Sequence, residues 1–588
     1  MVCIGIPKEA SMSEKEKHDI LRQNFHPSKV ASKWDVIVIG SGLSGLTTAK
    51  ILAASNRKVL VLEQHDRAGG ACHTFDLDRF EFDVDFHPSK VASKWDVIVI
   101  GSGLSGLTTA KILATSSRKV LVLEQHDRAG GACHTFDLDR FEFDVGLHYV
   151  AKMYPGSELY KICSAMTDSQ VQWQRIEDPF DLIVVGDKRY GRMNGGQKVF
   201  RQQLKEWFPE EKNKIDAYFD FINSCLKEIP WMFRIKFIPT FITRFLLKSD
   251  RTLLDTMREF AFSKELQAVC SYYYVNYGIP PNRASFFQHW LFLLDGGYYP
   301  IGGATMITSN IVRSIEKFGG KVLVKADVKE ITFEDGKVKA MFDVVKQLNA
   351  VDSPKVATFQ AYIGLSGSQN DLKLPPNNCF WFKNNDIFEI DKYLRMSLEE
   401  ALDYGCPPFV YVTFPSAKDP AWDDRHPGVS TCQLISVTNP EWFEDFKDKT
   451  KRKSQKRINK EEYFNLKNTI GEMMIEQLIK MFPDVAKEIV FTEFSSSLSQ
   501  QYYMQNAYGE LYSLAHNVDR FKPHFWSELR CTSEIPGLYL SGQDVLFCGV
   551  SSAFHNGLLT AGVILNRDLY KDLREAYNLQ SAEENKSK

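Results

Sequence analysis

The stretch DVIVIGSGLSGLTTAKILA, residues 96–114, decides the fold. Its apolar start at 96–100 predicts a buried parallel strand, which leads directly into Gly101, Gly103 and Gly106 in the order G-x-G-x-x-G. The first glycine permits a tight turn, the second lets a pyrophosphate approach the backbone, and the third lets the following helix pack on the strand. The helix N-terminus adds amide hydrogens and a positive dipole end. The stretch therefore predicts a Rossmann-like dinucleotide-binding unit.

An acidic residue follows where such units bind a ribose. After a second apolar strand at 120–123, Glu124 lies about twenty residues beyond the glycines, where a carboxylate can accept hydrogen bonds from ribose hydroxyls. A glycine-rich surface turn, the alternative interpretation, gives no reason for strand, helix, second strand and acid to occur in this order.

Two further segments favour a flavin over a nicotinamide cofactor. The R-x-G-G pattern at 128–131 resembles the second phosphate loop of large FAD-dependent oxidoreductases. Near the other end of the chain, residues 537–540 predict a strand, followed by Asp544 and a helix over 551–565. In such oxidoreductases this aspartate binds the ribityl chain and the helix N-terminus faces the pyrophosphate. A simple helix cap is the alternative role for Asp544.

The whole unit is written twice. Residues 25–84 and 86–145 are the same sixty-residue segment and differ at only two positions. The chain has a single segment around Asp544, and one sheet has one position for its strand. Only one copy of the repeat can therefore form the cofactor site. We predict that the second copy forms the site, because it alone continues into GLHY at 146–149. The first copy would then expose an unpaired VIVIG strand. A recent duplication and an error in the gene model both remain open as its origin.

Composition excludes several classes of protein. With 588 residues, 44% hydrophobic and 25% charged, the chain is long enough for two or three soluble domains. A net charge of -2 argues against nucleic-acid binding, and the basic run at 447–457 predicts a solvated loop. No apolar stretch has the length of a membrane-spanning helix, and residues 1–10 do not resemble a secretory signal. Eleven cysteines without a C-x-x-C pair indicate reduced thiols rather than disulfides or a metal site.

Residues 151–300 predict a mostly helical cap inserted into this fold, because they are rich in aromatic residues and lack strand–helix alternation. Within the cap, the run at 229–248 mixes large apolar residues with arginine and lysine. This is typical of a segment in a membrane interface, although ordinary buried structure fits equally well. The aromatic residues between Tyr272 and Phe292 predict either an apolar tunnel or a plain aromatic core.

Six short motifs resemble one family. They are EQH at 124–126, CHTF at 133–136, FDVGLHY at 143–149, GYYPIGG at 297–303, FPSAKDP at 414–420 and LSGQD at 540–544. Together they resemble the all-trans-retinol 13,14-reductase (retinol saturase) family of the phytoene desaturase-like FAD-dependent oxidoreductases. The resemblance extends over about residues 95–570. The FPSAKDP motif is the most discriminating, since flavin binding gives no reason for it.

The resemblance implies an oxidoreductase acting on CH–CH groups, which reduces the 13,14 double bond of all-trans-retinol to 13,14-dihydroretinol. It implies FAD as cofactor, leaves NAD or NADP open as electron donor, and suggests a retinoid or other isoprenoid lipid as substrate. It also implies peripheral association with the endoplasmic reticulum membrane. By position, FAD would be held by Gly101, Gly103, Gly106, Glu124, Arg128, Gly130, Gly131, Val328 and Asp544. His148 is the candidate catalytic residue, and Tyr149 and Tyr299 are the next candidates. A purely structural role is the alternative for His148.

These patterns predict an α/β fold, in which a Rossmann-like FAD-binding domain carries an inserted α+β substrate or cap domain, as in the amine oxidases and phytoene desaturases. The expected segments are tails at 1–33 and 571–588, a redundant Rossmann segment at 34–85, FAD-binding parts at 95–150, 301–340 and 531–570, a helical cap at 151–300 and a substrate domain at 341–530.

The chain departs from the family after a predicted hairpin at 335–340. There the family continues with paired strands and a V-x-N-A-like return to the flavin sheet, whereas this sequence continues with MFD at 341–343. Two alternatives therefore remain beside the leading hypothesis. One is a relative of the carotenoid desaturases and isomerases, which should lack the FPSAKDP motif. The other is a catalytically inactive protein with a flavin fold.

Overall fold

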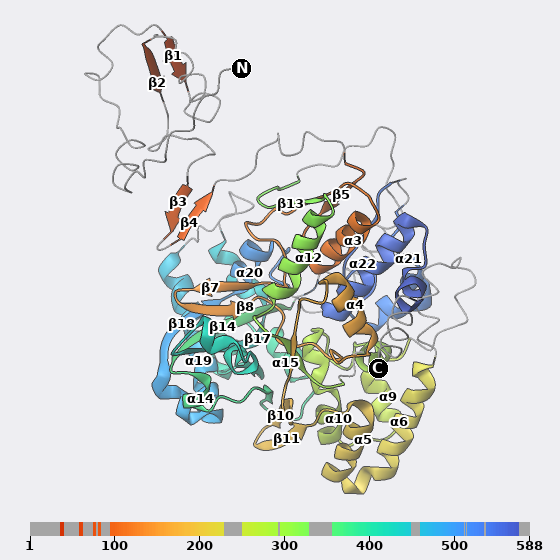
Figure 1. Ribbon diagram of the computed structural model, residues 1–588. Coiled ribbons are helices and arrows are strands. Elements are labelled where there is room, and N and C mark those ends of the chain that lie inside the picture. The colour runs from red at the N-terminus through yellow and green to blue at the C-terminus, as the bar shows by residue number, and fades with distance from the viewer. Residues whose placement is uncertain are drawn as a thin grey trace. The chain divides into compact units, whose positions relative to one another are not determined.

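The computed structural model describes residues 36–39, 58–62, 74–77, 80–83, 95–227, 250–291, 295–328, 356–447, 459–510, 512, 514–533 and 537–575 (Figure 1). The chain divides into two compact units, one of residues 1–94 with 323–327 and one of residues 95–322 with 328–588. Three predicted features lie outside the described residues: the run at 229–248, the hairpin at 335–340 and nearly all of the basic run at 447–457.

In the smaller unit, the first copy of the repeat forms four described strands. β1 (Val36–Ile39) pairs in parallel with β2 (Val59–Leu62), and β3 (Thr74–Leu77) pairs antiparallel with β4 (Phe80–Asp83). The second copy makes the same two pairings, so identical sequence gives identical local strands. The glycine loop of the first copy, which contains Gly42, is outside the described residues.

In the larger unit, the second copy begins the Rossmann-like fold. β5 (Val97–Ile100) pairs in parallel with β6 (Val120–Leu123), α3 (Leu104–Thr115) connects them, and β13 (Lys321–Leu323) extends the sheet in the order β13-β6-β5. The predicted strands at 96–100 and 120–123 are thus confirmed.

Two further helices pack on this unit. Figure 1 shows α3 beside α12 (Thr305–Lys317) and α22 (Gly549–Leu565), and the contacts between these helices agree with that view. The helix predicted at 551–565 is confirmed and begins two residues earlier. The C-terminal helix α22 therefore packs against α3, the first helix of the Rossmann-like fold in the larger unit. β7 (Thr135–Leu138) and β8 (Phe141–Asp144) form a hairpin after the glycine loops.

The strand predicted at 537–540 is wrong. These residues make only an isolated bridge, between Tyr539 and Thr532. β5 is the edge of its sheet, and its side chains Ile98 and Ile100 are 54% and 52% exposed. A strand persists only where a neighbour's backbone pairs with it. Among the described residues, β5 pairs with β6 alone and residues 537–540 join no sheet.

A seven-stranded sheet forms the second core of the larger unit. Its order is β11 (Lys188–Arg192), β10 (Asp181–Val185), β15 (Asn378–Phe382), β16 (Phe409–Thr413), β17 (Val429–Thr438), β14 (Ala357–Ser366) and β18 (Ile489–Ser495). Neighbours are antiparallel except β10 and β15. Alternate side chains enter opposite cores: Phe380 and Phe382 lie on one side, and Cys379 and Trp381 on the other.

Helices cover both faces of this sheet. α19 (Lys460–Met481) packs on the Trp381 side. The opposite side is packed by α5 (Gly196–Trp207), α6 (Lys212–Leu226), α9 (Leu253–Glu259), α10 (Lys264–Ser271) and α11 (Phe286–Leu291). The prediction of a mostly helical cap is therefore incomplete, because residues 151–300 also supply β9 (Trp173–Arg175), β10 and β11. The missed signal is the short apolar run LIVV at 182–185.

The remaining helices and strands are short. They are α4 (Glu158–Met166), β12 (Tyr298–Pro300), α14 (Gln369–Leu372), α15 (Glu389–Leu394), α16 (Leu398–Tyr404), α17 (Pro415–Lys418), α18 (Trp422–Arg425), α20 (Ser497–Met504) and α21 (Pro523–Glu528). Within the described ranges, no helix combines the length and the hydropathy needed to cross a bilayer.

Candidate functional site

A cavity of about 1480 Å³ lies along β5 and the glycine turn that follows it. Its walls include Gly101, Gly103 and Gly130 from the second copy, together with Val328. Residues 541–543 and the first turn of α22 complete the lining from the other end of the chain. The structure therefore brings both predicted halves of the cofactor site to one cavity, and this cavity is built on the second copy of the repeat.

The glycines give the cavity an open backbone wall. A Cβ atom at Gly101 or Gly103 would meet nothing within 4 Å. Gly106 has no such freedom, because its Cβ would overlap the carbonyl oxygen of Gly101. At Gly131, with φ +57°, a Cβ would lie 3.0 Å from the Cα of Gly103, so the two glycine loops touch. Exposed backbone at the N-terminus of a helix suits a pyrophosphate, so these residues fit a dinucleotide cofactor.

Glu124 is buried beneath the first glycine turn, with 4% of its surface exposed. One carboxylate oxygen accepts hydrogen bonds from Ser102 N at 2.8 Å and Ser102 Oγ at 2.5 Å. The other accepts one from His126 N at 3.0 Å and lies 2.6 Å from His126 Nδ1. Burial alone would raise the pKa of Glu124, but these hydrogen bonds outweigh it and lower the pKa to about 2. The carboxylate therefore organises the turn in addition to any contact with a ribose.

Replacing Glu124 with glutamine should destabilise the protein in a pH-dependent manner. The folded-state pKa of Glu124, about 2, lies below its ordinary value of 4.5. Its stabilisation is therefore present above about pH 4.5 and is lost as the pH falls towards 2. We expect Glu124→Gln to lower the free energy of unfolding by on the order of 2–3 kcal/mol at pH 7, and by less at pH 3.5. Urea denaturation at both pH values measures this, and an equal loss at both would contradict it.

The R-x-G-G loop is tied to the same turn. The amide of Gly130 donates to Ser102 Oγ at 3.0 Å, so Ser102 links this loop to Glu124. Arg128 donates from Nη1 to the carbonyl oxygen of Thr135 at 2.9 Å and is half-exposed. The predicted residues that the second copy contributes to the site are thus brought together around Ser102, which the sequence did not single out.

A buried arginine organises the opposite wall. Asp544 accepts a hydrogen bond at Oδ1 from the amide of Leu514 at 3.2 Å, and residues 541–543 before it face the cavity. Arg520 is fully buried and donates to the carbonyl oxygens of Leu514, Gln543 and Leu546. Burial lowers the pKa of Arg520 to about 10. The sequence around Arg520 carries no motif, so its role could be found only from the structure.

A second cavity, of about 250 Å³, adjoins the first. Five residues line both: Gly146, Leu147, Tyr512, Gly549 and Val550. Its other walls combine aromatic side chains, among them Tyr273 and Tyr277, with aliphatic ones such as Leu159 and Ile435. Other members of the aromatic run, among them Tyr272 and Trp290, are fully buried in the core, so the run provides both a cavity lining and a core; Phe292 lies outside the described residues.

His148 lies in the wall of this second cavity. Its ring centroid is 5.6 Å from that of Tyr411. Burial, together with the charge of the nearby Lys418, lowers the pKa of His148 to about 3. The imidazole is therefore neutral at physiological pH, and it does not act as an imidazolium acid. Tyr149 lines the same cavity, whereas Tyr299 is buried and donates to Asp144 at 2.7 Å.

The FPSAKDP motif places a buried lysine behind His148. Lys418 is 1% exposed, and its Nζ donates to the carbonyl oxygen of His148 at 2.9 Å. It also lies 2.5 Å from both Asn378 Oδ1 and Thr413 Oγ1, so three acceptors match the three N–H bonds of an ammonium group. Burial lowers the pKa of Lys418 and raises that of Asp144, and each offsets the shift of the other.

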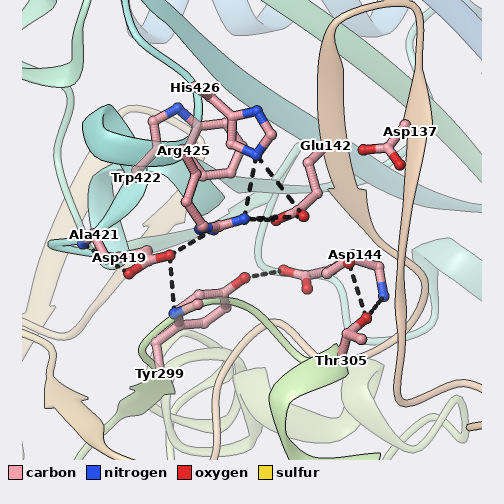
Figure 2. Close-up of polar contacts among 12 residues, drawn as sticks. Asp137, Glu142, Asp144, Tyr299, Thr305, Asp419, Ala421, Trp422, Arg425 and His426 are labelled. Atoms are coloured by element: carbon pink, nitrogen blue, oxygen red, sulfur yellow. Dashed lines mark hydrogen bonds and ion pairs between the residues drawn. The ribbon is translucent and has the colours of Figure 1, made fainter. Parts of the chain in front are cut away.

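Asp419, which follows Lys418 in the FPSAKDP motif, joins the two cores of the larger unit. Asp419 accepts hydrogen bonds at Oδ2 from the amide of Gly302 at 3.1 Å and from Arg425 Nη2 at 2.7 Å. Figure 2 shows Arg425 reaching from Asp419 to Glu142 of the β7–β8 hairpin, where Nη1 lies 2.9 Å from Oε1. Two of the six motifs, GYYPIGG and FPSAKDP, therefore meet at one junction with the β7–β8 hairpin. This explains why the FPSAKDP motif is distinctive although it does not line the cofactor cavity.

Comparison with known proteins places these features in context. A family model described as an NAD(P)-binding Rossmann-like domain matches residues 38–93 and 99–165, one match in each copy of the repeat. The all-trans-retinol 13,14-reductase of Homo sapiens is 34% identical over 548 residues, which cover 83% of this chain and 88% of that protein. Prolycopene isomerase 1 of an Oncidium hybrid cultivar is 28% identical over 278 residues, 42% of this chain and 45% of that protein.

Solved structures agree on the fold. A triple mutant of putrescine oxidase with redesigned cofactor binding superposes with a TM-score of 0.53 at 14% sequence identity, over 81% of this chain and 99% of that one. The predicted α/β class, a Rossmann-like domain with an inserted second domain as in the amine oxidases, is confirmed.

Proposed function

Because this chain belongs to the all-trans-retinol 13,14-reductase family, we propose that it saturates the 13,14 double bond of all-trans-retinol, giving 13,14-dihydroretinol, with FAD as cofactor. It is an oxidoreductase acting on CH–CH groups. The observation that carries the proposal is the meeting of two cavities at Gly146 and Leu147. One has the open glycine backbone that suits a dinucleotide, and the other has the aromatic walls that suit a polyene.

When bound, a reduced flavin supplies a hydride to one carbon of the double bond. The chain itself has to hold the substrate, exclude water and provide a proton for the other carbon. The aromatic walls of the smaller cavity serve the first two tasks. Lys418 does not line the cavity and its three N–H bonds are engaged, so it fixes the main chain of His148 in the cavity wall rather than protonating the substrate.

NAD or NADP serves as the ultimate electron donor, and the protein associates peripherally with the endoplasmic reticulum membrane to take up a retinoid or related isoprenoid lipid. The carotenoid desaturase or isomerase alternative is the weaker one, because such a relative matches less than half of this chain and the FPSAKDP motif has a structural role here.

Flavin spectroscopy tests the function directly. We expect the purified protein, after incubation with FAD, to show flavin absorption bands that bleach on anaerobic reduction and recover when all-trans-retinol is added, with dihydroretinol as product. A parallel sample with prolycopene is the control for the carotenoid alternative. A protein that retains no FAD would support an inactive flavin fold, and a reduced flavin that retinol leaves bleached would contradict the proposed substrate.

A further inference from the structure

The ring of His148 is a polar part of the aromatic cavity that the protein leaves without a partner. Its Nδ1 is buried, and no group among the described residues forms a hydrogen bond with it. Buried polar atoms are nearly always paired in native proteins, so an unpaired one in a cavity wall needs an explanation. Because His148 lines the cavity, a turn of its ring brings this nitrogen to a ligand that fills the cavity and can supply the missing partner.

The tyrosine hydroxyls of the same wall are already engaged. Tyr149 donates to Asp181 at 3.4 Å, Tyr411 to Asn378 Oδ1 at 2.7 Å and Tyr512 to the carbonyl oxygen of Asn276 at 2.5 Å, while the Tyr277 hydroxyl lies 2.9 Å from His289 Nδ1. Gln360, another polar residue of the wall, accepts at Oε1 from both Tyr362 and Gln433. Of the buried polar side-chain atoms in the described part of this wall, His148 Nδ1 is the one without a hydrogen-bond partner.

The position of His148 relates it to the cofactor cavity. It directly follows Gly146 and Leu147, which line both cavities. Its main chain is fixed, because Lys418 donates to its carbonyl oxygen from a buried and fully hydrogen-bonded position. Burial and the charge of Lys418 keep the imidazole neutral. A neutral imidazole has one donor and one acceptor nitrogen, the same capacity that an alcohol hydroxyl offers.

We propose that His148 holds the hydroxyl group of the polyene alcohol and thereby selects the double bond that is saturated. This inference rests on the proposed function. In an allylic alcohol, the carbon that bears the hydroxyl is bonded directly to the double bond. Holding the hydroxyl at His148 therefore fixes that double bond at the end of the aromatic cavity that adjoins the cofactor cavity. The more distant double bonds of the polyene then extend along the aromatic walls, away from the reacting position.

Ligand affinity tests the inference without relying on turnover. The probes are all-trans-retinol and its deoxy analogue, in which a methyl group replaces the hydroxymethyl group, and their binding is followed by quenching of protein fluorescence. We expect the wild type to prefer retinol by roughly tenfold, the effect of one buried hydrogen bond. His148→Phe should bind both probes about equally, and His148→Gln, which keeps a donor and an acceptor, should regain most of the preference. Tyr149→Phe is the matched control and should keep it.

The outcomes separate the two proposals. A wild type that binds neither probe would contradict the proposed function and the inference with it. A wild type that binds and reduces retinol, together with a His148→Phe protein that melts normally but still prefers retinol tenfold, would overturn the inference alone. Product analysis gives a second readout: retinol turned over by His148→Phe should yield a mixture of dihydro isomers, whereas a single 13,14-dihydro product would count against the proposed selection.

Discussion

A Gly103→Val variant should fold normally and bind no flavin. The residue has φ -57° and ψ 161°, an extended conformation that valine adopts without strain. Its Cβ would meet no protein atom within 4 Å, so the valine side chain would occupy cavity space rather than the protein core. That space is where a pyrophosphate would approach the backbone. We expect FAD affinity to fall by at least roughly a hundredfold, or about 3 kcal/mol, with little change in melting temperature.

The duplicated segment supplies the matched control for this experiment. Gly42 has the same position in the first copy, none of whose described residues lines the cavity, so Gly42→Val makes the same chemical change in the copy not assigned to the site. Flavin absorbance after gel filtration measures the outcome in both variants. If Gly42→Val lost the flavin and Gly103→Val kept it, the first copy would form the cofactor site and our choice of copy would be wrong.

The largest loss of stability is expected from Gly557→Leu. Gly557 lies where α22 crosses α3, and a Cβ there would overlap the side chain of Thr108 and lie 2.9 Å from the carbonyl oxygen of Ser105. Backbone cannot move aside as a side-chain tip can, so the two helices would have to separate. We expect a loss of more than about 4 kcal/mol in the free energy of unfolding, and hence little soluble protein.

A graded series makes this prediction testable even if the leucine variant fails to fold. Gly557→Ala should be recovered with a lowered melting temperature and weaker flavin binding, because even a single methyl group meets Thr108. Asn566→Gly, at the C-terminal cap of the same helix with φ +52°, should be neutral or slightly stabilising, since glycine suits that conformation. Equal melting temperatures for Gly557→Ala and the wild type would show that the helices do not meet as described.

The parts of the site that could be predicted from the sequence are those determined by local backbone geometry. The glycines at 101, 103 and 106 predict a turn with close backbone contacts, and the helix that begins at Gly549 consists mostly of small and apolar residues. The seven-stranded sheet gave no such signal. The strand at 357–366 is buried on both faces and lacks alternation, and its partners lie more than sixty residues away along the chain.

The roles of individual polar residues could not be predicted, because they depend on distant partners. Glu124 was expected to contact a ribose, but nothing in the sequence indicates that Ser102 and His126 donate to it. Lys418 belonged to a motif without an assigned role until its contact with the carbonyl oxygen of His148 was seen. The strand predicted at 537–540 failed for the same reason, since strand formation depends on a neighbour that the local sequence does not reveal.

The crossing of α3 and α22 also determines how late in synthesis the cofactor site can be completed. Thr109 and Gly557, which contact one another there, are separated by 448 residues. At about 5–20 residues per second, a ribosome needs roughly 20–90 s to make the second after the first. For that time the nascent Rossmann unit lacks the helix that completes its cofactor site, while the edge of β5 that no described strand covers is available to other strands. Yield in the cell should therefore respond more to chaperone supply than to the stability of the finished fold.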